Sequence, residues 1–182
     1  GTMEQWVNAT VALPLDTTNI TGLPVDTEFV DFDGVDDYVE VTGMMASDSY
    51  FGACTISATV NVTDTASTRA IWALGAGSYR LYTASGTWHL NSTTSTGVSV
   101  TAGMHEISIT YDASGNAKSF SLNGTEVWTG TAAGGGATTS FYIGARYSGG
   151  VGLFFKGSIF NFSITGSSVK NFAFDGYGAT PW

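Results

Sequence analysis

Apolar and polar residues alternate along most of the chain with a period of two, which is the pattern of half-buried β-strands. The clearest examples are CTISATVNV (Cys54–Val62) and HEISITY (His105–Tyr111). Similar segments, rich in Val, Ile, Thr, Phe and Tyr, recur along the chain: YVEV, AIWAL, YRLYT, TWHLN, GVSVT, SFSLN, TEVWTG, SFYIGA and GSIFNFSIT. No apolar pattern at helical spacing extends over three turns. The sequence therefore predicts an all-β protein with minimal helix content, as a sandwich, jelly roll or barrel.

Turn sequences separate several of these segments. DASGN (Asp112–Asn116) lies between EISITY and KSFSL, and Asn123-Gly124 lies between SFSL and TEVW. Asn and Gly tolerate the left-handed conformations that tight turns require, so these three segments are predicted to form a meander. The glycine-rich stretch Thr131–Thr139 is interpreted as a loop, and its pattern differs from that of a phosphate-binding loop.

The chain length of 182 residues is that of one domain, taken here as residues 1–182. Gly1 and Thr2, which precede Met3, are typical of an expression scar. A chain this long buries roughly 70% of its unfolded surface and needs no disulfide to be stable. The single cysteine, Cys54, cannot form an internal disulfide, and its apolar surroundings predict a core residue.

Charge and composition narrow the possible partners. The formal net charge is −9, from 15 acidic and six basic residues, a balance that repels phosphate backbones and predicts no nucleic-acid partner. No apolar run approaches the length of a transmembrane helix and the first residues lack a signal segment, so we expect no membrane insertion. Few charges with abundant Ser, Thr, Gly and aromatic residues are typical of secreted or virion β-proteins, and we expect an extracellular or virion-surface location.

Four segments in a fixed order carry a resemblance to a known family. They are FDGVDDYVEV (Phe32–Val41), CTISATVNV, HEISITYDASGNAKSFSLNGTEV (His105–Val127) and FYIGARYSGGVGLFFKGSIFNFSIT (Phe141–Thr165). Together they resemble laminin G-like domains of the concanavalin A-like lectin and glucanase superfamily, which includes pentraxin-like members. The resemblance covers about Phe29 to Asp175 and implies a jelly-roll β-sandwich of two antiparallel sheets, one of them concave. The ending FNFSITGSSVKNFAFDGYG also resembles the ends of such domains in bacteriophage tail and other virion proteins.

The acidic stretch VDFDGVDDYVEV (Val30–Val41) has two interpretations that stay open. In the first it is a strand, a turn and a strand, with Asp33, Asp36 and Asp37 accepting backbone N–H bonds in the turn. In the second it binds calcium, which takes six to eight oxygens from carboxylates and carbonyls. Glycoside hydrolysis at this stretch is disfavoured because the central glycine interrupts the strand that would align two carboxylates toward one sugar.

The resemblance also implies a place for a structural Ca²⁺. Members of the superfamily hold such an ion between an early loop and an aspartate near the last strand. The matching late residue is Asp175, in FAFDG. The early turn would contribute the carbonyl of Gly34, or one near Gly43, together with Asp36 and Asp37.

No constellation of catalytic residues is recognisable, so we expect no enzymatic activity. The two histidines, His89 and His105, lie in strand-like segments without the spacing of a zinc site, and His105 is interpreted as a hydrogen-bonded structural residue. No nucleophile elbow of the GxSxG type is present.

The resemblance implies that the concave face and its rim loops bind ligands, often glycans, and the strand alternation indicates which residues lie on the outward face. If Leu81, Leu90, Phe141 and Ile143 point into the core, their neighbours point to the opposite face. The residues expected on that face are Arg80, Tyr82, His89, Asn91, Tyr142 and Arg146, with Tyr147 at its rim. Trp88 is then expected in the core, whereas Trp72 fits either side. Aromatic planes and planar polar groups of this kind suit sugar rings and their hydroxyls, so Arg80, Tyr82, His89, Tyr142, Arg146 and Tyr147 are the predicted ligand-binding residues.

Two functions compete on this basis. The first is a non-catalytic, lectin-like carbohydrate-binding module that mediates surface adhesion, for example of a phage tail or virion, with a cell-surface glycan or polysaccharide as partner. The alternative is a structural or decoration domain of a virion without a sugar site of its own, whose partners are other virion proteins or copies of the same chain.

Overall fold

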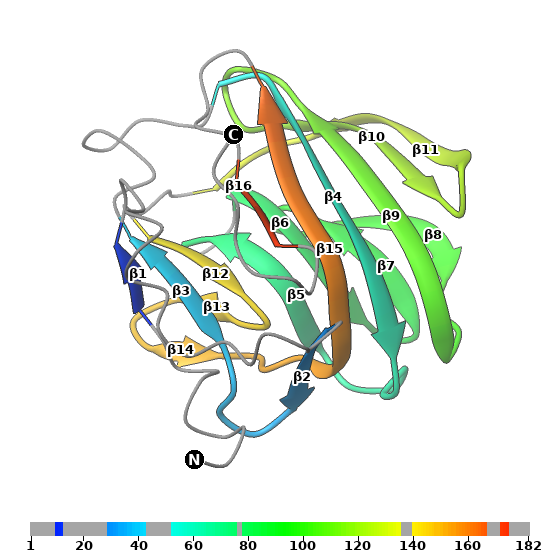
Figure 1. Ribbon diagram of the computed structural model, residues 1–182. Coiled ribbons are helices and arrows are strands. Elements are labelled where there is room, and N and C mark those ends of the chain that lie inside the picture. Colours follow the sequence, from blue (N-terminus) through cyan, green and yellow to red (C-terminus); the bar gives the residue numbers. More distant parts are fainter. Residues whose placement is uncertain are drawn as a thin grey trace.

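A computed structural model describes residues 10–12, 29–42, 52–75, 78–135, 140–166 and 172–174. All regular elements in these residues are strands, so the all-β prediction is confirmed (Figure 1). The strands are β1 (Thr10–Ala12), β2 (Val30–Asp33), β3 (Val39–Thr42), β4 (Cys54–Val62), β5 (Arg69–Leu74), β6 (Ser78–Ala84), β7 (Thr87–Leu90), β8 (Thr94–Ser99), β9 (Gly103–Tyr111), β10 (Ala117–Leu122), β11 (Thr125–Ala132), β12 (Ser140–Ile143), β13 (Arg146–Tyr147), β14 (Val151–Gly152), β15 (Lys156–Gly166) and β16 (Phe172–Phe174). Among the described residues, no helix is long and apolar enough to cross a membrane.

The strands form two large sheets and one short hairpin (Figure 1). The first sheet has the order β1-β3-β12-β5-β6-β7-β8. The second has the order β11-β10-β9-β4-β15-β16, with β2 also pairing with β15, and β13 pairs with β14. Neighbours in both sheets are antiparallel apart from the parallel pair β1 and β3. Because strands far apart in the sequence pair within each sheet, the chain passes repeatedly between the two layers of a jelly-roll sandwich.

The predicted meander is confirmed by strands β9, β10 and β11 of the second sheet. Phe120 on β10 pairs with Ile109 on β9 and with Trp128 on β11. The second turn contains Asn123 and Gly124 with φ values of 51° and 75°, the left-handed region in which Asn and Gly are tolerated. The turn residues Asn123 and Gly124 therefore predicted this part of the topology correctly.

The core lies between the two sheets and is built from the inward positions of the alternating strands. Leu81, Leu90, Phe141, Ile143 and Trp88 are all fully buried there, as predicted. Each side chain of this size contributes about 1.5–3 kcal/mol by its removal from water.

The position of Trp72, which the pattern left open, is the core. Its ring lies 5.6 Å from that of Phe162 in an edge-to-face arrangement, so the two sheets meet through this pair. Strand β5 has register shifts on both sides of Trp72 and is buried from Ala70 to Leu74. The period-two pattern therefore could not predict which residues of β5 point into the core and which point outward. Cys54 is also buried, and burial raises the pKa of its thiol to about 12, which keeps it an unreactive core residue.

Asn91 lies inside the molecule, and its predicted outward position is wrong. It follows β7 with a φ of 51°, which takes its side chain off the strand alternation. Its amide donates to the carbonyls of Gly115 (2.9 Å) and Ala132 (2.7 Å), and its Oδ1 accepts the N–H of Arg80 (3.1 Å). The Asn91 side chain thereby links β6 and β7 of the first sheet to the β9–β10 turn and to β11 of the second sheet through hydrogen bonds.

Candidate functional site

The outer face of the first sheet is defined by two rows of side chains that cross its central strands. In one row, Tyr142 on β12 pairs with Glu40 on β3 and with Ala73 on β5. In the other, Tyr82 on β6 pairs with Ala70 on β5 and with His89 on β7. The alternation that buries Leu81 and Leu90 thus places Tyr82 and His89 on one outward surface.

Arg80, Tyr82 and His89 form a continuous stack on this face. The guanidinium carbon of Arg80 lies 3.8 Å from the centroid of the Tyr82 ring, and the rings of Tyr82 and His89 are 4.9 Å apart. Arg80 Nη2 and the Tyr82 hydroxyl both donate to the carbonyl of Ser92, at 3.1 and 3.2 Å. Arg80 is only 3% exposed and Tyr82 6%. These two residues consequently form the packed floor of the face.

The imidazole of His89 has an assignable proton. Its Nε2 lies 2.9 Å from Thr87 Oγ1, and that hydroxyl donates to the carbonyl of Ala84, so Nε2 must be the donor. Burial lowers the pKa of His89, and the nearby Arg80 charge lowers it further, which favours the neutral ring near pH 7. Nδ1 is then an acceptor, buried and without a hydrogen-bond partner among the described residues.

Tyr142 anchors a second aromatic group, beside strand β3. Its hydroxyl donates to Glu40 Oε1 at 3.0 Å. Burial, followed by the hydrogen bond and charge of Glu40, raises the pKa of Tyr142 to about 12. The ring of Tyr38 lies 6.1 Å from that of Tyr142 and 6.3 Å from that of Phe154. Tyr142 itself is 5% exposed, so it supports its neighbours and presents little surface.

Arg146 and Tyr147 are the accessible part of the face. They form β13, in a hairpin held against β5 by bonds from Gly144 N to the Ile71 carbonyl (2.8 Å) and from Ala70 N to the Leu153 carbonyl (2.7 Å). The Tyr147 ring is stacked on that of Tyr142, with centroids 5.9 Å apart and an interplanar angle of 13°. Tyr147 is 38% exposed and Arg146 is half-buried.

The six predicted ligand-binding residues therefore meet on one face but differ in accessibility. Three are buried supports (Arg80, Tyr82 and Tyr142), two are half-buried (His89 and Arg146), and Tyr147 is exposed. That they bind a ligand stays a prediction. Sequence reasoning missed Glu40, Tyr38 and Phe154 as neighbours of the site. Glu40 was detectable as the outward residue between Val39 and Val41, whereas the approach of Phe154 depends on the β13–β14 hairpin.

His105, the second histidine, lies elsewhere and is structural, as interpreted from the sequence. Its Nε2 is 2.8 Å from the carbonyl of Thr101, and its ring meets that of Trp88 edge-on at 5.7 Å. It is buried in the core and contributes nothing to the outer face.

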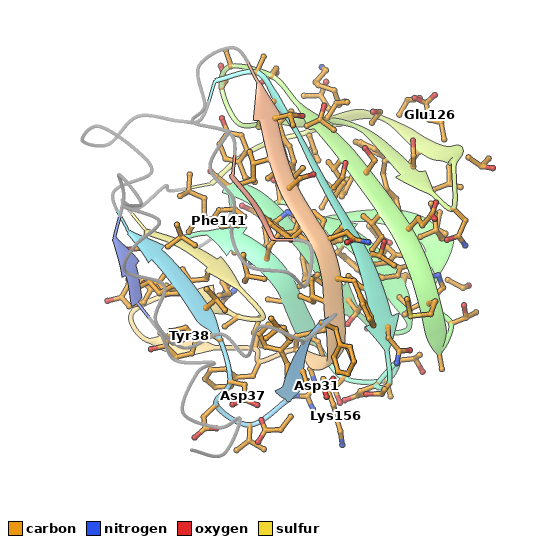
Figure 2. All side chains as sticks on the ribbon, viewed as in Figure 1. Asp31, Asp37, Tyr38, Glu126, Phe141 and Lys156 are labelled. Atoms are coloured by element: carbon orange, nitrogen blue, oxygen red, sulfur yellow. The ribbon has the colours of Figure 1, made fainter. Side chains whose placement is uncertain are left out.

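The acidic stretch is a strand, a turn and a strand, and the two strands belong to different sheets. β2 pairs with β15 in the second sheet, whereas β3 pairs with β12 in the first. In the turn, Asp33 Oδ1 accepts the N–H of Val35 (2.7 Å) and Asp37 Oδ2 accepts the N–H of Asp33 (2.9 Å). Figure 2 shows Asp37 and Lys156 at the same end of the sandwich, away from Glu126. The predicted strand, turn and strand are thus confirmed, with Asp33 and Asp37 accepting backbone N–H bonds in the turn.

The same turn gathers three carboxylates. One carboxylate oxygen from each of Asp33, Asp36 and Asp37 lies within 4.8 Å of the other two. Burial raises the pKa of Asp37, and the charges of Asp33 and Asp36 raise it further. Carboxylate oxygens are the ligands that calcium prefers, so these residues fit part of the coordination shell that such an ion needs.

The remaining predicted calcium ligands are placed differently. The carbonyl of Gly34 accepts a hydrogen bond from Arg69 Nη1 at 2.7 Å, so it already faces a cationic group. Arg69 also pairs with Asp64 at 3.0 Å and donates to the carbonyl of Phe154. Asp175 lies outside the described residues. Calcium binding at this turn stays a prediction.

Comparisons with known proteins support the fold. No family model matches the chain, and no curated protein matches it. Domains LG4-5 of the mouse laminin alpha1 chain match with a TM-score of 0.52 at 12% identity, covering 81% of this chain and 41% of that one. A structure of botulinum neurotoxin type C matches with a TM-score of 0.51 at 14% identity, covering 74% and 38%. A Trypanosoma rangeli sialidase in complex with 2,3-difluorosialic acid matches with a TM-score of 0.47 at 20% identity, covering 63% and 20%.

These matches concern architecture. The chain spans about a fifth of the sialidase and about two fifths of the laminin and neurotoxin chains. The laminin and neurotoxin domains are jelly-roll sandwiches, and the described strands have the same architecture. The predicted fold class is therefore confirmed.

Proposed function

We propose that the chain is a non-catalytic, lectin-like carbohydrate-binding module that mediates adhesion at an extracellular or virion surface. The observation that carries the proposal is the exposed ring of Tyr147, held parallel to Tyr142 and adjacent to Arg146 on β13. A rigid aromatic plane packs against the apolar face of a pyranose ring, while a neighbouring guanidinium hydrogen-bonds its polar groups. Support from Tyr142 lowers the entropy lost when Tyr147 is immobilised by a ligand.

Fold analogy supports the same class of ligand. The botulinum neurotoxin structure is described as showing that cell entry depends upon interaction with two ganglioside molecules, which are glycolipids. A shared fold does not transfer a ligand, because function resides in the residues of the site. The analogy therefore makes glycans the first ligands to test.

Binding without hydrolysis is proposed because of the carboxylates on this face. Glycosidases commonly use a pair of carboxyl groups on either side of one glycosidic bond. Of the described strand residues around Tyr142 and Tyr82, Glu40 is the acidic one, and its Oε1 accepts the Tyr142 hydroxyl. One engaged carboxylate does not make such a pair.

Replacement of Tyr147 tests the proposal. Binding of the intact chain to a panel of oligosaccharides is first measured by glycan array and then by calorimetric titration, with micromolar to millimolar affinity expected. Tyr147→Ala should then weaken binding of the selected glycan about tenfold, which corresponds to about 1.4 kcal/mol. Tyr147→Phe keeps the ring and should retain most of the affinity.

A matched control is Met104→Ala, which removes an exposed apolar side chain from β9 in the second sheet. It should leave glycan binding unchanged. If a glycan binds and Tyr147→Ala binds it as well as the unaltered chain does, the proposed site is wrong.

A second candidate function is favoured by one observation. Arg80 stacks on Tyr82, and Tyr142 packs against Tyr38 and Tyr147. Arg80, Tyr82 and Tyr142 are almost fully buried, as expected if the outer face serves stability and assembly. The chain would then be a structural or decoration domain of a virion. This candidate predicts a defined oligomer by light scattering and no response to any glycan on the array.

A further inference from the structure

The aromatic group around Tyr142 contains a second ring besides Tyr147. The ring of Tyr147 lies 5.9 Å from that of Tyr142, and the ring of Tyr38 lies 6.1 Å from it. Among the described residues no ring contact joins Tyr38 to Tyr147 directly, so the two occupy separate positions beside Tyr142. Their separation cannot exceed the sum of these two distances, which a short oligosaccharide can span.

Tyr38 lies on the same outer face as the proposed glycan site. On β3, Val41 is buried opposite Phe141, whereas Glu40 pairs with Tyr142 on the outer face. Because side chains alternate along an extended segment, Tyr38 is expected on the same side as Glu40, and its ring contact with Tyr142 agrees with this position. Figure 2 shows Tyr38 at the side of the sandwich that contains β3 and the β13–β14 hairpin.

The segments around Tyr38 are joined by hydrogen bonds. The Tyr38 ring lies 6.3 Å from that of Phe154, whose carbonyl accepts a bond from Arg69 Nη1 at 3.0 Å. The same nitrogen donates at 2.7 Å to the carbonyl of Gly34, in the turn that leads to Tyr38. Arg69 is itself paired with Asp64 at 3.0 Å. A ring held in this way loses little conformational entropy when a ligand packs on it.

Polar atoms next to the Tyr38 ring have unused hydrogen-bonding capacity. Glu40 is half-buried, and its Oε1 accepts the Tyr142 hydroxyl at 3.0 Å. Within the described part of the chain, Glu40 Oε2 has no hydrogen-bond partner, and neither has the hydroxyl of Tyr38. A carboxylate oxygen accepts hydroxyl hydrogens, and a phenol both donates and accepts, so both groups suit the hydroxyls of a sugar.

We infer that this face binds an oligosaccharide of at least two sugar units, with one ring on Tyr147 and another ring of the same chain on Tyr38. Hydroxyls of the unit on Tyr38 bond Glu40 Oε2 and the Tyr38 hydroxyl. Each aromatic plane adds apolar contact only when a sugar ring lies on it, so two planes favour a chain over a single sugar. The inference rests on the proposed carbohydrate-binding function and specifies the length of its ligand.

Sugars of increasing chain length test the inference on the intact chain. Three series are titrated calorimetrically: glucose to cellotetraose, N-acetylglucosamine to chitotetraose, and mannose to mannotetraose. In at least one series, the trisaccharide should bind about tenfold more tightly than the monosaccharide.

Tyr38→Ala should remove most of this gain with chain length. Tyr38→Leu keeps apolar bulk without a flat ring and should do the same, whereas Glu40→Gln removes the carboxylate charge and should reduce the gain in part. Tyr147→Ala should instead weaken the binding of sugars of every length. Val35→Ala is the matched control, because it removes an exposed apolar side chain from the neighbouring turn, and it should change nothing. Thermal unfolding of each variant checks that the fold is intact.

The possible results distinguish the two proposals. Binding that does not tighten with chain length in any series would overturn the inference while preserving the carbohydrate-binding function. A gain that survives in folded Tyr38→Ala and Tyr38→Leu would also overturn it, since the added units would then contact other residues. Binding of no sugar, in these series or on the glycan array, would overturn the proposed function and the inference together.

Discussion

The outer face of the first sheet carries stacked rings and arginines, whereas the outer face of the second sheet carries rows of hydroxyl groups. On the second sheet, Ser57 Oγ bonds Ser108 Oγ at 3.1 Å, and Thr110 Oγ1 bonds Ser119 Oγ at 2.7 Å. Two rows cross that sheet in register: Ser163, Ser57, Ser108 and Ser121, and next to it Thr165, Thr55, Thr110, Ser119 and Thr129. Both faces follow the same strand alternation.

The difference shows that alternation decides which residues point outward, and side-chain chemistry decides what an outward face can do. Small hydroxyls paired with one another offer neither a large plane nor a net charge to a ligand. On the first sheet, Tyr147 and Arg146 offer both, on a support formed by Tyr142 and the Arg80–Tyr82 stack. We therefore place the candidate site on the first sheet, and the following experiments test whether the two faces differ as described.

The largest loss of stability is expected from replacing Asn91, whose side chain hydrogen-bonds the two sheets to each other. Asn91→Ala removes three buried hydrogen bonds, to Arg80 N and to the carbonyls of Gly115 and Ala132. Buried groups that lose their partners each cost about 1–3 kcal/mol, so we expect the free energy of unfolding to fall by about 3 kcal/mol or more. Urea unfolding followed by tryptophan fluorescence measures the loss.

Two variants separate the hydrogen bonds from the backbone conformation. Asn91→Gly tolerates the φ of 51° and should recover about 1 kcal/mol relative to alanine. Asn161→Ala is the matched control, because Asn161 also has a left-handed φ, 46°, but is exposed on β15. A loss at Asn91 no larger than that at Asn161 would show that its buried amide does not fasten the sheets.

The next largest change in stability is expected from calcium binding at the turn between β2 and β3, which contains Asp36 and Asp37. If the ion binds only the folded chain, at one hundred times its dissociation constant it adds about 2.7 kcal/mol of stability. Thermal unfolding of EDTA-treated protein should then show a higher midpoint when calcium is added. Asp36→Asn and Asp37→Asn should reduce that shift.

Without calcium, the raised pKa of Asp37 predicts that replacing this carboxylate does not lower stability at neutral pH. Because its pKa is raised in the folded chain, this carboxyl favours folding below its ordinary value near 3.8, and that contribution is lost as pH rises through the folded pKa. At neutral pH without calcium, Asp37→Asn should therefore be neutral or slightly stabilising. An unchanged midpoint with and without calcium would leave this turn a purely structural connection.

The sequence pattern predicted some of these residue positions correctly and others incorrectly. Period-two alternation placed Leu81, Leu90, Phe141 and Ile143 in the core and gathered the outward residues on one face. It failed at Asn91 because one left-handed residue after β7 leaves the alternation, although Asn in the run NSTT was a signal for such a turn.

Long-range pairing was beyond the reach of the local pattern. Val30–Val41 was correctly predicted as a strand, a turn and a strand, but not as a crossing between sheets. That crossing depends on β12, which follows β3 by about 100 residues, and on β15, which follows β2 by about 125 residues. The burial of Arg80, Tyr82 and Tyr142 likewise depends on tertiary contacts, which the spacing of residues along the sequence cannot predict.

The smallest effect is expected from removing a single hydroxyl from each face. Tyr142→Phe deletes the bond to Glu40 but keeps the ring, and should cost about 1 kcal/mol at pH 8 in urea unfolding. The pKa of Tyr142 is about 12 when folded and its ordinary value is 10.0, so the neutral hydroxyl stabilises the fold fully below pH 10. This contribution is lost as pH rises through 12, and the difference between Tyr142→Phe and the unaltered chain should close and then change sign over that interval, because two pKa units outweigh about 1 kcal/mol.

Ser57→Ala is the matched deletion on the second sheet, where the bond to Ser108 is part-buried and joins neutral groups. It should cost no more than Tyr142→Phe at pH 8, because its partner is uncharged, and its effect should not change between pH 10 and 12. Tyr142→Phe should also keep Tyr147 stacked, so glycan affinity should fall far less than in Tyr147→Ala. If both deletions gave the same pH profile, the Tyr142–Glu40 bond would be no different from a surface hydroxyl pair, and the contrast between the faces would reduce to Tyr147 and Arg146.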